Sequence, residues 1–144
     1  MRRWLLSLGL WVGLTASEAT AMPLRQSLAM FESGASGAAR GAADLKRGGS
    51  GEVSRFQIMP DVWHQYSRSR DYDDPDTAWQ VASRILNDRC KRFRSATGRE
   101  PNAQEIYLLW NKPGSFEASG FVLSKVKPLY RERAGRFANL HHSR

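Results

Sequence analysis

The longest regular pattern of apolar and polar residues runs through the middle of the chain, over residues 75–97. It opens with Asp74 and Pro75, a capping residue followed by a proline that suits the first turn of a helix, and it closes at Gly98. Apolar side chains recur on one face of the segment, at Ala78, Val81, Ala82, Ile85, Leu86 and Phe93. The pattern predicts one long amphipathic helix with a buried face.

Shorter helical patterns lie on both sides of this segment. Residues 23–33 place Leu24, Leu28 and Phe31 at positions i, i+4 and i+7, and Gly34 follows as the expected C-cap. Further helices are expected at residues 62–66, 102–110 and 129–142. The chain is therefore expected to be predominantly α-helical.

The segment between the first helix and the central one has a different character. Residues 36–51 are rich in Gly, Ala and Ser, which predicts a loop with one turn of helix near residues 42–46. Residues 53–58 carry the β-branched and aromatic side chains of a short extended segment, and Pro60 ends it. The expected fold is a helical domain with a small extended region in this part.

The first residues have the composition of a targeting segment. Arg2 and Arg3 precede an apolar run over residues 4–14 that is too short to span a bilayer, and Ala19 to Ala21 form a small-x-small cleavage site. Residues 1–21 are therefore expected to be a signal peptide, and the protein to be exported to the periplasm or the extracellular space. Residues 22–144 are expected to fold as one monomeric domain with no stable membrane span.

Charge and cysteine content narrow the possible partners. Without residues 1–21 the net charge falls from +8 to +7, which favours polyanions such as an anionic membrane face or a cell-wall polymer with carboxylates. Export makes nucleic acid the least expected of these partners. Cys90 stands alone, and the three histidines lack metal-ligand spacing, so we expect no disulfide, no metal site and no cofactor.

Glu32 is the candidate for chemistry. It follows Phe31 in the last turn of the first expected helix, where the helix field disfavours an anion and helps to keep the acid protonated. A glutamic acid with a raised pKa can protonate the leaving oxygen of a glycosidic bond at neutral pH. Glu32 is thus a candidate general acid.

Four short segments occur in the order found in lysozyme-like proteins. They are Glu32-Ser33, Gln57-Ile58-Met59-Pro60, Asp74-Pro75 and Trp110-Asn111-Lys112-Pro113-Gly114. In these segments the chain resembles the lysozyme-like superfamily, in particular soluble lytic transglycosylases and goose-type lysozymes. The resemblance spans residues 31–114 and implies a lysozyme-like helical domain whose extended region lies next to a catalytic cleft.

The resemblance also implies an activity. It is cleavage of the β-1,4 bond between N-acetylmuramic acid and N-acetylglucosamine in peptidoglycan, by lytic transglycosylation or by hydrolysis, with Glu32 as general acid and then base. Glycan strands would be the partner, and the residues expected to bind them are Ser33, Ser54, Gln57, Tyr107, Trp110 and Asn111. The alternative is a catalytically silent module that binds peptidoglycan or serves as a scaffold.

Glu52 adds a second carboxylate ahead of the Gln57 segment, and Asp44 offers a third. A second carboxylate that positions water would permit hydrolysis, so Glu52 is a candidate catalytic residue. The other interpretation of Glu52 is a structural ion pair with Arg55 or Lys46. Trp63, Trp79 and Trp110 are candidates for stacking on sugar rings, with core packing favoured for Trp79.

Overall fold

The computed structural model describes residues 21–143. Six α-helices and two 3₁₀ turns follow one another along this part of the chain: α1 Leu24–Ser33, η1 Ala42–Leu45, α2 Pro60–Tyr66, α3 Pro75–Thr97, α4 Ala103–Asn111, α5 Pro113–Ala118, η2 Leu123–Lys125 and α6 Pro128–His142. The predicted α class is confirmed. Residues 1–20, which hold all but the last position of the expected signal peptide, lie outside the described part.

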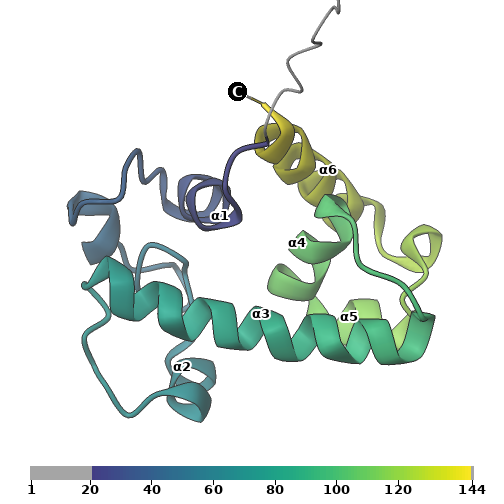
Figure 1. Cartoon of the computed structure of the whole chain (residues 1–144), viewed down its shortest axis with the longest axis horizontal. Coiled ribbons are helices and arrows are strands. Elements are labelled where there is room, and N and C mark those ends of the chain that lie inside the picture. Colours follow the sequence, from purple (N-terminus) through teal and green to yellow (C-terminus); the bar gives the residue numbers. More distant parts are fainter. Residues whose placement is uncertain (1–20, 144) are drawn as a thin grey trace, which may run out of the picture.

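Helix α3 is the long central helix that the sequence predicts, and it runs along one side of the molecule (Figure 1). The Asp74 side chain accepts a hydrogen bond of 2.7 Å from the backbone N–H of Thr77, and Gly98 ends the helix in the left-handed conformation with φ of 73°. The buried residues of α3 include all six that the apolar pattern identifies. Helices α2 and α4 pack against it.

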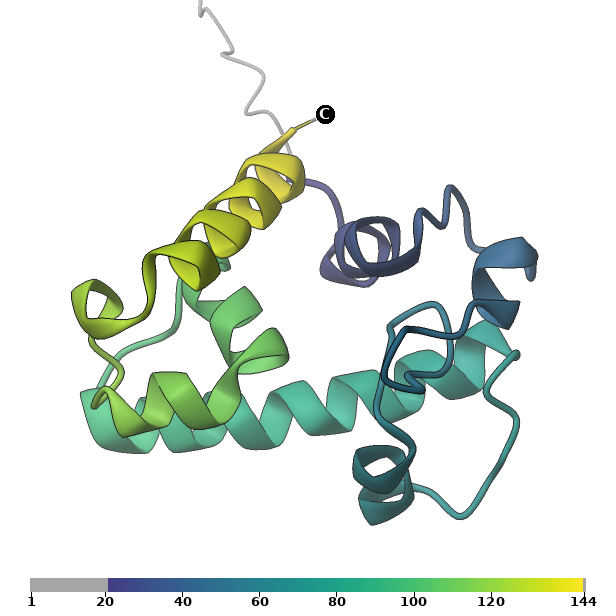
Figure 2. The ribbon, with the colours of Figure 1, turned by 180° about the vertical axis from the view of Figure 1, so that it is seen from behind.

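Helix α6 packs on α1 and α4, away from the middle of α3 (Figures 1 and 2). The start of the described chain lies beside the end of α6, where Met22 N–H donates to the carbonyl of His141 at 2.9 Å. The hydroxyl of Ser27 in α1 lies 2.9 Å from His141 Nδ1. Helix α1 is thus held against the last helix just before and within its first turn.

The core draws on all six α-helices and on the turn before α2. Its largest fully buried side chains are Trp63, Tyr107, Phe56, Phe93, Phe116 and Phe137. Stacking of Tyr107 on Phe137, with ring centroids 4.9 Å apart, joins α4 to α6. These contacts fix the position of α4 relative to the helices on either side of it.

Residues 53–58 form a tight turn, which corrects the expected extended segment. Within the described residues, Val53 and Ile58 make a single antiparallel bridge and no strand is formed. Ser54 and Gln57 have positive φ values of 67° and 51°, so the chain reverses between the two bridge residues. The predicted loop and its one helical turn before this segment are confirmed by η1.

Helix α5 was not expected. Asn111 to Gly114 indicate a helix stop, and α4 does end at Asn111, but Pro113 occupies the first turn of a new helix. Phe116, which is fully buried, anchors this short helix to the core. Among the described residues no helix is long and apolar enough to cross a membrane.

Candidate functional site

Glu32 lies in the last turn of α1, and its carboxyl group is surrounded by groups from α4 and α6. The side chain is only 7% exposed. The hydroxyl of Tyr107 donates to Glu32 Oε1 at 2.6 Å, and Arg133 Nε donates to the same hydroxyl at 2.8 Å. Nη2 of Arg133 lies 3.7 Å from Glu32 Oε2.

The pKa of Glu32 is raised above its ordinary value, chiefly because burial disfavours the charged form. The hydrogen bond from Tyr107 and the charges of Arg133 and Lys46 lower it, while the neighbouring charge of Glu52 raises it further. Burial prevails. Such a carboxyl group keeps its proton at a higher pH than an exposed glutamate does.

Two cavities meet at Glu32. One has a volume of about 380 Å³ and is walled by α2, α3 and the end of α4; the other has a volume of about 460 Å³ and opens towards α6. Both are lined by Glu32, Glu52, Gln57, Asn111 and Lys112, so they adjoin. We call the two cavities together the Glu32 cleft.

Glu52 and Gln57 face Glu32 from the turn that precedes α2. Glu52 Oε2 accepts a hydrogen bond of 3.0 Å from the N–H of Ser50, and Glu52 has no salt-bridge partner among the described residues. The alternative interpretation of Glu52, a structural ion pair with Arg55 or Lys46, is therefore wrong. The Gln57 amide nitrogen donates to the carbonyls of Ser54 and Lys46, at 2.9 and 3.2 Å.

Gly48 packs directly on these two side chains. A Cβ at this position would overlap the carboxylate of Glu52 and would lie 2.8 Å from Gln57 Oε1. At Gly49, in contrast, a Cβ would meet nothing within 4 Å. Only glycine fits at position 48 while Glu52 stays where it is.

The end of α4 supplies the opposite wall. Asn111 lines both cavities, and Trp110, which is 8% exposed, lines the cavity next to α2 and α3. Met59 and Leu129 are exposed apolar residues that line the cleft at different places, the first near α2 and the second on α6. The cleft thus combines carboxyl and amide groups with apolar surface, as sites for small polar ligands do.

Three of the residues expected to bind substrate do not line the cleft. Tyr107 is buried behind Glu32 and reaches it only through its hydroxyl. Ser54 is fully buried, and its hydroxyl accepts the N–H of Phe56 at 3.2 Å. The Ser33 hydroxyl donates to the carbonyl of Ala29 at 2.9 Å, as helical serines do. The structure therefore places these three residues outside the lining of the cleft.

Two tryptophans are also outside the cleft. Trp63 is fully buried and donates from its ring nitrogen to the carbonyl of Ser69 at 2.8 Å, so it has no surface for a sugar ring. Trp79 packs on Phe56 with ring centroids 5.6 Å apart, in agreement with the expected core role. Trp110 is the one of the three candidates that lines the cleft.

Asp44 is a structural residue. It forms a buried ion pair with Arg55, with Nε to Oδ1 at 2.6 Å and Nη2 to Oδ2 at 2.8 Å. Arg55 also donates to the carbonyls of Gly37 and Ala39, at 2.7 and 2.8 Å. These bonds fasten the long loop before the turn at 53–58, so the pair positions the loop that carries Gly48 and Glu52.

Sequence reasoning missed four cationic residues at the cleft: Lys112, Arg133, Arg136 and Arg89. Lys112 directly follows the expected residue Asn111, a position that could have identified it. The three arginines have no such signal, because each lies on an amphipathic helix among other arginines. Their place at the site depends on how α3 and α6 pack.

Comparisons with protein families, curated proteins and solved structures find no match to this chain. Within residues 21–143 no three His, Cys, Asp or Glu side chains are grouped to hold a metal ion. Cys90 is half-buried, and burial raises the pKa of its thiol, which disfavours the reactive thiolate.

Proposed function

We propose that this protein cleaves the β-1,4 bond between N-acetylmuramic acid and N-acetylglucosamine in peptidoglycan, with Glu32 as the general acid. The observation that carries the proposal is a buried glutamic acid of raised pKa at the meeting point of two adjoining cavities. A polymer lying across both cavities would present a glycosidic oxygen to Glu32. The ordered segments that resemble lysozyme-like proteins support the same chemistry.

In the proposed reaction the Glu32 carboxyl group donates its proton to the bridging oxygen as the bond from that oxygen to the anomeric carbon breaks. The departing N-acetylglucosamine unit leaves with a new hydroxyl group. The Glu32 carboxylate then takes a proton from the group that attacks the anomeric carbon. That group is water in hydrolysis, or the C6 hydroxyl of the same muramic acid unit in transglycosylation.

In this proposal the role of Glu52 differs between hydrolysis and transglycosylation. Its carboxylate lines both cavities and has no salt-bridge partner among residues 21–143, so it is available to orient a water molecule. Hydrolysis would use such a water. Transglycosylation needs none, and Glu52 would then contact the sugar.

The test is mass spectrometry of the fragments released from purified cell wall. Anhydro-muramoyl ends identify a transglycosylase, and reducing ends identify a hydrolase. Glu32→Gln should release neither. The matched control is Glu100→Gln, since Glu100 is an exposed glutamate whose partner is Arg94 at the far end of α3.

If the wild-type protein releases no cell-wall fragment but sediments with the wall, the binding module is favoured instead. The Tyr107 hydrogen bond and the Arg133 charge are the observations that favour this second candidate, because both stabilise the ionised form of Glu32. In that case Glu32 would serve as a hydrogen-bond acceptor for the glycan.

A further inference from the structure

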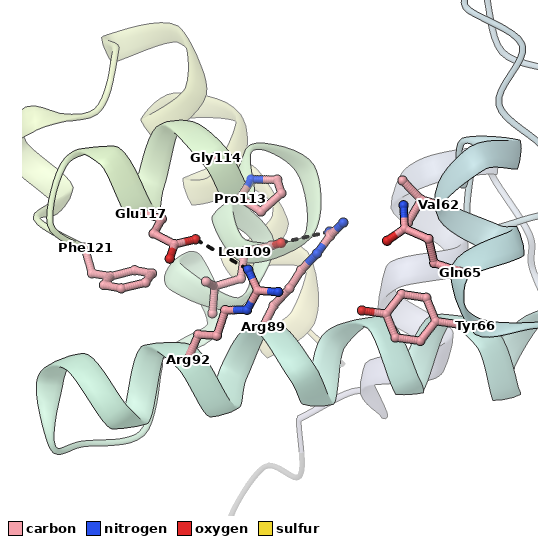
Figure 3. Close-up of a pocket in the computed structure, with 10 residues that line it drawn as sticks. All are labelled: Val62, Gln65, Tyr66, Arg89, Arg92, Leu109, Pro113, Gly114, Glu117 and Phe121. Atoms are coloured by element: carbon pink, nitrogen blue, oxygen red, sulfur yellow. Dashed lines mark hydrogen bonds and ion pairs between the residues drawn. The ribbon is translucent and has the colours of Figure 1, made fainter.

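A third hollow opens next to the Glu32 cleft, between α2, α3 and α5 (Figure 3). Its volume is about 240 Å³, and it shares Val62, Arg89 and Pro113 with the cavity beside Glu32. A ligand in the cleft could therefore extend a branch into this hollow. We call it the arginine pocket, after Arg89 and Arg92 in its wall.

Arg89 stands at the junction of the arginine pocket and the cleft. Its Nη1 donates to the carbonyls of Leu109 and Trp110, at 3.0 and 2.8 Å. Figure 3 shows the guanidinium group between the side chains of α2 and Pro113. No fully buried side-chain nitrogen among the described residues lacks a partner, so the Arg89 nitrogens that donate to no protein group are not fully buried, and Arg89 lines both the pocket and the cleft.

The charge of Arg89 is not neutralised by the protein. The half-buried guanidinium has no carboxylate within ion-pair distance in the part of the chain that the structure describes. Burial lowers the pKa of Arg89, a sign that its cationic form is held at a cost in this setting. An anion in the pocket would offset this cost.

Arg92 lies one turn further along α3, on the same face of the helix. Its Nη1 is 3.8 Å from Glu117 Oε2, and the two side chains are 67% and 53% exposed. Such a loose, exposed pair is weak, so a ligand carboxylate can replace Glu117 as the partner of Arg92. Gln65 adds a neutral amide on the α2 side of the pocket (Figure 3).

We propose that the arginine pocket binds a carboxylate of the peptide branch of peptidoglycan, with Arg89 as its main partner and Arg92 as the second. This inference rests on the proposed function, since the branch belongs to the polymer that occupies the Glu32 cleft. It assigns to the pocket the recognition of a charged peptide rather than of a sugar. Two guanidinium groups on one wall suit the two oxygens of a carboxylate.

The experiment compares two soluble probes by isothermal titration calorimetry. One is the disaccharide N-acetylglucosaminyl-N-acetylmuramic acid that carries its peptide branch, with the peptide carboxylates free. The other is the same compound with every peptide carboxylate amidated. Neither contains the bond that the proposed reaction cleaves, so neither is consumed. We expect the free acid to bind at least about 10-fold more tightly, as charge-assisted hydrogen bonds predict.

Variants test whether the preference for the free acid comes from the arginine pocket. Arg89→Gln should abolish the preference for the free acid, and Arg92→Gln should reduce it by about 3-fold. Glu117→Gln removes the competing carboxylate and should increase the preference by a similar factor. Arg94→Gln, on the same helix and paired with Glu100, is the control and should leave it unchanged.

The inference is overturned if wild type does not distinguish the probes, if it binds neither, or if Arg89→Gln keeps the full preference. Arg89→Gln can fail to fold, because the end of α4 loses its hydrogen-bond donor. In that case Arg92→Gln and Glu117→Gln test the inference. It is refuted if neither variant changes the preference for the free acid. Digestion of cell wall separates this result from the proposed function. Cleavage without probe preference overturns the pocket alone, and preference without cleavage overturns the catalytic proposal alone.

Discussion

The hydroxyl of Tyr107 donates a hydrogen bond of 2.6 Å to Oε1 of Glu32, which lies 75 positions earlier in the chain. Burial raises the pKa of Tyr107 well above its ordinary value, so the hydroxyl keeps its proton and remains a donor. No hydrogen bond to Oε2 is formed within the described residues. We infer that the proton of the acid form is carried on Oε2.

Glu32→Gln is expected to remove cleavage and to preserve the fold. Loss of a general acid lowers the rate by roughly 10²- to 10⁴-fold or more. The amide oxygen can still accept the Tyr107 hydrogen bond, and the substitution removes a carboxylate that burial destabilises at neutral pH, so the melting temperature should not fall. Turnover of cell wall and thermal melting at pH 7 are the measurements. Near-normal turnover would exclude Glu32 as the acid.

Tyr107→Phe is expected to shift the pH dependence of cleavage. Because the hydrogen bond from Tyr107 stabilises the carboxylate, its loss should raise the pKa of Glu32 further. The acid form is present below this pKa and is lost as pH rises through it, so the alkaline limb of the pH–rate profile should move to higher pH. The loss of stability should be about 1 kcal/mol.

The control for this change is Tyr72→Phe. Its hydroxyl lies 2.8 Å from His64 Nε2, outside the cleft, and removing it should leave the alkaline limb in place. A shift to lower pH in Tyr107→Phe would contradict the role of the Tyr107 hydrogen bond in stabilising the Glu32 carboxylate.

Gly48→Ala is expected to displace Glu52 at little cost in stability. The new methyl group meets the far end of the Glu52 side chain, which can rotate away, so unfolding in urea should change by less than about 1 kcal/mol. If Glu52 takes part in the reaction or holds the sugar, Gly48→Ala and Glu52→Gln should lower the rate by similar factors. Gly49→Ala is the control, since a Cβ there meets nothing.

A rate loss in Glu52→Gln without any in Gly48→Ala would mean that Glu52 acts from another position than the one described. Unchanged rates in both variants would exclude Glu52 from the reaction and would favour transglycosylation by Glu32 alone.

Asp44→Asn is expected to destabilise the protein by about 3 to 5 kcal/mol, because it leaves the buried charge of Arg55 without its partner. Burial by itself would raise the pKa of Asp44, but the hydrogen bonds from Arg55 and from the Gly41 N–H hold it below its ordinary value. The contribution of this pair to the free energy of unfolding is therefore fully present above the unfolded-state pKa of about 3.9. It is lost as pH falls through the lowered pKa of Asp44 in the folded state.

Urea unfolding at neutral and acidic pH checks this prediction. The control is Asp76→Asn, which breaks an exposed ion pair with Arg25 and should cost at most about 1 kcal/mol. Equal losses in the two variants would contradict the structural role of the Asp44–Arg55 pair.

The helices could be predicted because their ends are marked by neighbouring residues. Asp74, Pro75 and Gly98 act within one turn of the helix that they limit, so their effect is visible in the sequence. Helix α5 was missed because Pro113 was interpreted only as a stop. The buried Phe116 three residues later was the available signal for a new helix.

The candidate site was predictable only in part. Glu32 could be proposed from its place at a helix end and from the resemblance of the Glu32-Ser33 segment. Its partners Tyr107 and Arg133 come from α4 and α6, and no local pattern encodes such contacts. Ser54 was misplaced because the turn at 53–58 directs it inward through positive φ values, which the sequence of the turn does not reveal.

The packing of α6 on α1 and α4 has a consequence for the order in which the chain is made. Synthesis runs from the N-terminus, so Glu32 leaves the ribosome about one hundred residues before Arg133 and the end of α6 do. Until α6 docks, α1 lacks the helix that covers it, and the Tyr107 hydroxyl lacks its donor from Arg133. The burial that raises the pKa of Glu32 is therefore completed late, and a growing chain carries an ordinary, exposed glutamate at this position.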